Sequence, residues 1–330
     1  MTDPIKREDL PQAAPFAPDA PDAAAAPLAR PGLGIGIARV REIGQRLGPE
    51  SSGIVLMLAA IFLFTVMDAC AKHLVQTQPP MQVVWARYAS QTFWGFLVFA
   101  PRLRTLLKTR NYGLQALRSG LLFGATFCFF MALEALPIAE AIAVFEVAPL
   151  FITILAVLVL GEQVGPRRMM GVVAGFAGAL IIIRPGAEVF SWSSLLPMGA
   201  AFFYAAYSIA TRFLGPSENP LTSFLYTSLF GTVAATFIVP FYWATPSAGN
   251  GALMFGFGII GGIGQYLMIL SLSLAPASLL APIGYAGLIF GTFWGFMIFG
   301  ETPDGWTVAG ALVIVGAGLY VWARERRRGA

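Results

Sequence analysis

Three ionisable residues lie inside long apolar stretches of the sequence: Asp68, Arg87 and Glu146. A charge within the hydrocarbon of a membrane is costly, so such a residue is by default a candidate for binding or proton transfer. Measured along each apolar run at about 1.5 Å per residue, all three lie about 9 to 12 Å from the same membrane surface. An arginine binds carboxylates, and a carboxylate binds ammonium groups. We therefore expect the three residues to face one shared cavity that suits a zwitterion.

The same charges also admit structural roles. Asp68 and Lys72 are four residues apart and could pair on one face of a helix. Arg87 could be an anchor for Asp68 or for Glu146 and contact no ligand. The residues alone leave both interpretations open.

The composition excludes several classes of protein. Of the 330 residues, 57% are hydrophobic and only 12% are charged, whereas a soluble domain carries about 25% charged residues. An ordinary water-soluble enzyme is therefore excluded. Cys70 and Cys128 lie in apolar runs and His73 is the single histidine, so neither a disulfide framework nor a metal site is expected. No phosphate-binding loop of the ATPase type occurs, and we expect no cofactor and no nucleic-acid partner.

The elements that must position the charges are long apolar runs. A membrane-spanning helix needs about 20 apolar residues, and ten runs separated by turn signals fit this length. Residues 1–50 contain seven prolines and few apolar residues, so we expect a disordered N-terminal tail there. The predicted fold is an all-α integral membrane protein with ten transmembrane helices at residues 53–74, 80–100, 114–136, 138–160, 167–184, 193–213, 222–243, 252–274, 276–299 and 304–322.

The basic residues predict an orientation. With ten spans both termini lie on one side, and placing them in the cytoplasm leaves 18 of the 21 lysines and arginines inside and two, Lys72 and Arg184, outside. Such an excess is typical of cytoplasmic segments. In this count Arg118 belongs to the loop before the third span. We therefore expect a multi-pass protein of the cell inner membrane, with both termini, including a basic tail at 323–330, in the cytoplasm.

The two halves of the apolar region resemble each other at a shift of 139 to 140 residues. For example, Leu160-Gly161-Glu162 corresponds to Phe299-Gly300-Glu301. Residues 53–184 and 193–322 thus form two repeats of five spans, and an odd number of spans inserts the second copy upside down. Inverted repeats are typical of transporters that rock around a midplane site. The two glycines suit a left-handed helix end, and we expect each glutamate to satisfy the N–H groups of the helix that follows it.

The repeat also indicates that the scaffold does not require the three charges. Their counterparts in the second half are Ser208, Thr227 and Tyr285, none of which is charged at neutral pH. Charge confined to one half is easier to explain by a ligand or a proton than by folding. Tyrosines near the charged band or its counterpart complete the candidate substrate-binding or coupling residues, which are Asp68, Arg87, Tyr88, Glu146, Tyr207 and Tyr285.

Several segments carry a family likeness. They are the apolar-Gly-Glu segment of each repeat, the run Pro137-Ile138-Ala139-Glu140-Ala141, and Trp85-Ala86-Arg87-Tyr88 in the second span. With these segments the sequence resembles the drug/metabolite transporter superfamily, and within it the EamA-like branch, over residues 53–322. The second half departs from the first, since Tyr285 stands in place of Glu146. The resemblance implies a carrier of small organic metabolites and leaves the substrate open.

We expect a secondary transporter and not an enzyme. It would move an amino acid, or an amino-acid-like zwitterion or cation, across the inner membrane by alternating access, coupled to protons or by exchange. The resemblance of Ala139-Glu140-Ala141 implies an S-adenosylmethionine-type uptake carrier as an alternative. An integral membrane enzyme acting on lipid is the other alternative, but it would need a nucleophile and a base that the sequence does not bring together. The expected partners are the small-molecule substrate and the lipid bilayer, and the protein is expected to be a monomer or a homodimer.

Overall fold

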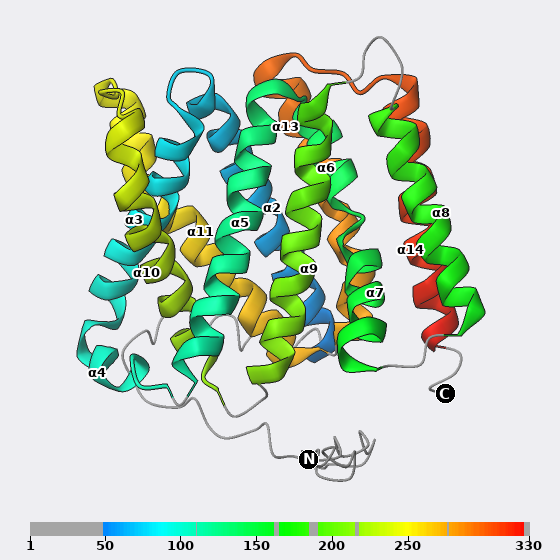
Figure 1. Ribbon diagram of the computed structural model, residues 1–330, viewed down its shortest axis with the longest axis horizontal. Coiled ribbons are helices and arrows are strands. Elements are labelled where there is room, and N and C mark those ends of the chain that lie inside the picture. Colours follow the sequence, from blue (N-terminus) through cyan, green and yellow to red (C-terminus); the bar gives the residue numbers. More distant parts are fainter. Residues whose placement is uncertain are drawn as a thin grey trace, which may run out of the picture. The chain divides into compact units, whose positions relative to one another are not determined.

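The structure is a computed structural model that describes residues 49–109, 111–161, 165–184, 191–214, 218–275 and 277–326. All regular elements within these residues are helical, which confirms the predicted all-α class. The predicted N-terminal tail lies outside the described residues except for Pro49 and Glu50, and so does the end of the basic tail. The helices (Figure 1) are α2 (Pro49–Val75), α3 (Pro80–Phe99), α4 (Leu103–Leu106), α5 (Tyr112–Ala135), α6 (Ile138–Phe145), α7 (Ala148–Leu160), α8 (Pro166–Ile183), α9 (Leu196–Leu214), α10 (Pro220–Ile238), α11 (Ala248–Leu274), α12 (Ala277–Leu280), α13 (Ala286–Phe299) and α14 (Gly305–Arg326).

Local sequence signals specify many of the helix ends. Pro80, Pro166 and Pro220 are the first residues of α3, α8 and α10, where the missing N–H of proline removes no helical hydrogen bond. Gly161 and Gly300 end α7 and α13 in the left-handed conformation, with φ of 68° and 67°. Glycine adopts this conformation without strain, so both predicted helix ends are confirmed.

Six of the helical segments are long and apolar enough to cross a membrane, judged by length and composition. They are Glu50–Val75, Tyr112–Ala135, Ile138–Leu160, Trp192–Leu214, Pro220–Tyr242 and Ala248–Leu272. Three shorter apolar helices accompany them at Met169–Ile183, Ile283–Phe299 and Gly305–Tyr320. The number of ten spans remains a prediction.

The packing of the helices reflects the repeat. α2 packs along α11, and α5 packs along α9. In the repeat, α2 corresponds to α9, and α5 corresponds to α11. The α5–α9 contact is therefore equivalent to the α11–α2 contact, with each helix replaced by its counterpart in the other half. The contacts α2–α13 and α9–α7 are related in the same way, whereas α3 packs on its own counterpart α10 and α8 on its counterpart α14 (Figure 1). The two halves therefore build one shared interior rather than two separate domains.

The start of α14 shows how a loop carboxylate stabilises a helix end. Asp304 Oδ1 accepts a hydrogen bond from the backbone N–H of Thr307 at 2.7 Å, and its Oδ2 lies 2.8 Å from Nη2 of Arg184. The hydrogen bonds from Thr307 are the main reason why the pKa of Asp304 is lowered below its usual value, and Arg184 adds to the effect. The carboxylate thus favours the folded state in its ionised form.

We expect Asp304→Ala to lower the thermal stability of the purified protein by about 1 kcal/mol at neutral pH, as for the loss of an N-terminal helix cap. A lowered folded-state pKa gives a stabilisation that is complete above the usual aspartate pKa and is lost as the pH falls through the folded-state value. The difference between wild type and Asp304→Ala should therefore shrink at acidic pH in a thermal-unfolding series. Asp304→Asn, which keeps an acceptor for Thr307, should lose less. Equal stability of all three proteins at neutral pH would contradict the assignment.

Candidate functional site

A break interrupts the fourth predicted span. We expected one continuous helix at residues 138–160, but α6 ends at Phe145 and α7 begins at Ala148. At the break the N–H of Val147 donates to the carbonyl of Val144, three residues back, at 3.2 Å. Pro149, near the start of α7, has no N–H for the helical bond across the break, which favours the interruption. Glu146 lies in the break.

The ninth predicted span is interrupted at the corresponding place. We expected a continuous helix at 276–299, but a 3₁₀ turn at Ala281–Tyr285 separates α12 from α13. Tyr285 is the repeat counterpart of Glu146, so both halves break at equivalent residues. Pro282 lies at the start of this turn. Discontinuous spanning helices that meet near the middle of a membrane protein are typical of substrate sites in transporters.

Glu146 faces polar groups of the second half. Its Oε1 lies 3.8 Å from the position that a Cβ would occupy on Gly287 in α13. Tyr204 of α9 and Tyr285 lie within electrostatic range of the carboxylate. Among the described residues, no hydrogen bond or ion pair engages the side chains of these three residues. The Glu146 carboxylate and the Tyr204 hydroxyl thus have no hydrogen-bonding partner within the described residues, and the Tyr285 hydroxyl, also without one, packs against Gly318 of α14.

Asp68 and Arg87 form a second group. Arg87 Nη1 donates to Thr126 Oγ1 at 3.0 Å, its Nε is buried without a partner, and its guanidinium lies 5.6 Å from the ring centroid of Phe130. Asp68 is within electrostatic range of Arg87. The structure therefore places Asp68 near Arg87. That the three charges face one cavity remains a prediction.

The structure gives Tyr88 and Tyr207 supporting positions. Tyr88 is only 1% exposed, and its hydroxyl is hydrogen-bonded at 2.8 Å to Oγ1 of the same Thr126 that holds Arg87. Tyr207 in α9 accepts a hydrogen bond from Arg118 at 2.7 Å. Both hydroxyls are thus engaged by the protein, in contrast to those of Tyr204 and Tyr285.

Arg118 corrects one sequence-based assignment. We counted it in a cytoplasmic loop, but it lies within α5 and is 5% exposed. Its Nε donates to Thr211 at 2.8 Å, its Nη1 donates at 3.1 Å to Thr227, and its guanidinium carbon lies 4.6 Å from the ring centroid of Tyr207. One side chain therefore ties α5 to α9 and α10 of the other half. The sequence contained two signs of this role. Arg118 lies inside the predicted span at 114–136, and its partner Thr227 is the repeat counterpart of Arg87.

Aromatic rings connect these groups. The ring centroids of Phe129 and Phe145 lie 5.5 Å apart, those of Phe145 and Tyr204 lie 5.5 Å apart, and those of Tyr204 and Tyr207 lie 5.7 Å apart. This aromatic row runs from α5 across α6 to α9 and ends at Arg118. Because Glu146 directly follows Phe145, the row passes beside the free carboxylate. Sequence reasoning missed Phe145 and Tyr204, since aromatic residues are too frequent in this chain to stand out.

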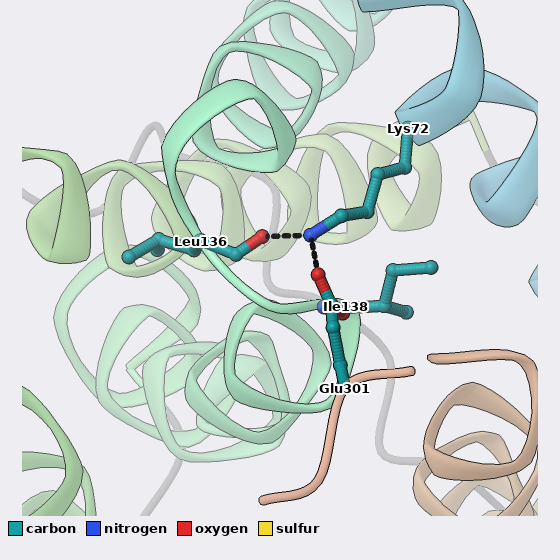
Figure 2. A network of polar contacts seen from close by, with 4 residues as sticks. All are labelled: Lys72, Leu136, Ile138 and Glu301. Carbon is teal, nitrogen blue, oxygen red and sulfur yellow. Dashed lines mark hydrogen bonds and ion pairs between the residues drawn. The ribbon is translucent and has the colours of Figure 1, made fainter. Parts of the chain in front are cut away.

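The contacts of Lys72 and Glu301 decide one open alternative and correct one expectation. Lys72 does not pair with Asp68 but forms an ion pair with Glu301 (Figure 2). Glu301 does not cap the helix that follows it, since its Oε2 accepts a hydrogen bond from the N–H of Ile138, the first residue of α6, at 3.0 Å. Glu162, the counterpart of Glu301 in the first repeat, lies outside the described residues.

Comparison with known proteins gives a consistent result. The sequence profile of the EamA-like transporter family matches residues 51–184 and 191–322. The riboflavin transporter of Vibrio cholerae is 30% identical over 84% of this chain and 95% of its own length. The S-adenosylmethionine uptake transporter of Rickettsia prowazekii is 27% identical over 84% and 94%, and the pseudopaline exporter of Pseudomonas aeruginosa is 27% identical over 80% and 93%. A solved crystal structure with 21% identity shares the fold, with a TM-score of 0.62 over 85% of this chain and all of its own.

Proposed function

The chain belongs to the EamA-like transporter family, and from this premise we propose that it moves a small organic molecule across the cell inner membrane by alternating access of its two halves. The family and the relatives are transporters rather than enzymes, and the protein is a multi-pass membrane protein of this kind. The helices would form ten spans in two inverted repeats, at residues 53–184 and 193–322. The exchange of helix contacts between the halves supports this arrangement.

The single observation that carries the proposal is the pair of equivalent breaks at Glu146 and Tyr285. A helix break inside a membrane leaves backbone polar groups without helical partners, which is tolerated where they line a cavity or contact other protein groups. Here the breaks coincide with side chains that the protein leaves unpaired. We infer that the substrate binds between them, beside Tyr204.

The groups at the site indicate the chemistry of the substrate. Glu146 and Asp68 would bind an ammonium or other cationic group, and Arg87 would bind a carboxylate. The flat faces of Phe145 and Tyr204 would hold a planar ring by stacking. We propose an amino-acid-like zwitterion or cation that carries a ring, moved with protons or in exchange. The names of the relatives agree in part, since S-adenosylmethionine has both features, whereas riboflavin has the ring without the amino-acid group.

We also propose that both termini face the cytoplasm. The distribution of Lys and Arg supports this orientation even though Arg118 lies within a helix, because 17 of the 21 basic residues remain on the cytoplasmic side of the proposed topology. The end of the bundle with Lys72 then faces outward.

The test is flux into liposomes that contain the purified protein. We expect S-adenosylmethionine and tryptophan to enter faster than leucine, and riboflavin to compete for the site. Absence of flux for the whole panel would contradict the proposed substrate class, and a covalently altered lipid would favour the membrane-enzyme alternative.

A separate experiment tests the orientation. A protease added outside intact right-side-out membrane vesicles should leave residues 1–48 uncut. Cleavage of this segment would contradict the proposed orientation.

A further inference from the structure

The ion pair of Lys72 and Glu301 joins the two halves of the chain. Lys72 lies near the end of α2 in the first half, and Glu301 follows α13 in the second half (Figure 2). Their side chains are 6% and 22% exposed. A buried ion pair is held together strongly only while water is kept away, because its attraction weakens steeply as the local dielectric rises.

Both charges also bind the ends of helices. Lys72 Nζ donates to the carbonyl of Leu136, just after α5, at 2.6 Å, and Glu301 accepts from the N–H of Ile138 at the start of α6. Positive charge at a helix C-terminus and negative charge at an N-terminus are both favourable. The ends of α5 and α6 therefore fix which position holds the cation and which holds the anion.

Two helices connect this ion pair to the proposed substrate site. α6 begins at Ile138, bound to Glu301, and ends beside Glu146, about 12 Å away at 1.5 Å per residue. α13 begins directly after Tyr285 and ends at Phe299, two residues before Glu301, so it spans about 21 Å. Each helix thus has one end in the ion pair and the other in the broken segments. A ligand that shifts the broken segments would shift the partners of the ion pair as well.

We propose that Lys72 and Glu301 form a latch between the two halves, which must break before the bundle opens at this end. The latch does not touch the substrate. It sets how often the site becomes accessible from the side where α2 ends, and α6 and α13 link it to Glu146 and Tyr285. This inference rests on the proposed alternating-access function.

A second ion pair at the same end serves as a comparison. Arg184 and Asp304 also come from different halves, but their side chains are 28% and 45% exposed. An exposed pair is worth little because water and salt screen it. Its loss should therefore leave the opening unchanged, which makes Asp304→Asn a matched control for Glu301→Gln.

The chain contains its own reporter of opening. Cys70 lies on α2 two residues before Lys72, is partly buried, and is within electrostatic range of Asp68. In a Cys128→Ser background, reconstituted in nanodiscs, the rate at which a water-soluble maleimide labels Cys70 measures opening without any substrate. We expect Glu301→Gln to raise this rate about tenfold, because loss of the ion pair destabilises the closed state and so increases the population of the open state. Asp304→Asn should leave the rate within about twofold of wild type.

A folded Glu301→Gln variant that labels at the wild-type rate would overturn the latch. Should Glu301→Gln fail to fold, the double variant Lys72→Met/Glu301→Gln removes both charges, leaves no unpaired lysine, and should label as fast; unchanged labelling in that variant would also overturn the proposal. The failure of the transport function would look different. In that case Cys70 labelling would respond to the substitutions as described, while wild-type liposomes showed no flux.

Discussion

Gly258→Ala is expected to yield almost no folded protein. Gly258 lies in α11 where this helix crosses α3, and an added Cβ would fall 2.6 Å from Cα of Gln91 and closer still to the backbone at Ser90 and Gln91. Carbon atoms approach no nearer than about 3.5 Å in good packing. The obstructing atoms belong to the backbone of α3, so no side-chain rotation relieves the clash.

The damage would extend beyond one contact. α11 packs along both α2 and α3, and α3 also packs against α10 of the second half. Moving α3 outward would therefore open the core that holds Tyr88 and Phe257, both fully buried. Overpacking at an adaptable site costs about 1 to 3 kcal/mol, and the cost here should exceed that range because two helix backbones must separate.

The measurement is the yield of monodisperse protein in size-exclusion chromatography, with thermal unfolding of whatever is recovered. Gly256→Ala is the matched control, because Gly256 lies on the same helix with no atom within 4 Å of the added Cβ. It should express and unfold like wild type. Wild-type yield and stability of Gly258→Ala would show that α3 and α11 do not cross as closely as described.

Local features of the fold were predictable from the sequence because their causes are local. Gly161 and Gly300 end their helices as predicted, since a left-handed residue after an apolar run strongly favours glycine. The breaks at Glu146 and Tyr285 were not predicted. A proline such as Pro149 is compatible both with a kinked continuous helix and with two helices, and the choice depends on neighbours that are distant in the sequence.

The candidate site was predictable only in part, for the same reason. The depth of each residue within its predicted span identified Asp68, Arg87 and Glu146 as unusual charges, and the structure places Asp68 within electrostatic range of Arg87. Depth does not specify which face of a helix a side chain occupies. The partner of Lys72 is Glu301, 229 positions away in the chain, whereas the i,i+4 spacing had offered Asp68 as a possible partner. Long-range pairing of this kind requires the three-dimensional arrangement of the halves.

Glu146→Gln is expected to abolish most transport while leaving the fold intact. Glutamine has the size of glutamate and retains an acceptor oxygen, and the wild-type carboxylate makes no hydrogen bond or ion pair among the described residues that the substitution would break. The repeat counterpart Tyr285 indicates that a neutral polar side chain fits such a break. Thermal stability should therefore stay within about 0.5 kcal/mol of wild type.

Transport should respond differently, because a neutral amide attracts a cationic group far less than a carboxylate does. A hydrogen bond to a charged group contributes about 1.5 to 3 kcal/mol, so the flux at limiting substrate concentration should fall about tenfold to a hundredfold. If Glu146 also carries the coupling proton, the residual flux will no longer vary with pH. The groups that face it, Tyr204 from α9 and Tyr285 from the second break, are hydroxyls, so the carboxylate is the acidic group expected to exchange a proton there.

Two substitutions make the result specific. Glu134→Gln changes the same chemical group on an exposed part of α5 and should transport like wild type. Tyr204→Phe removes one of the free hydroxyls but keeps the aromatic row, so it should weaken flux less than Glu146→Gln does. Normal flux in folded Glu146→Gln would leave Glu146 as a packing residue of the helix break, and substrate recognition would then have to depend on Asp68 and Arg87.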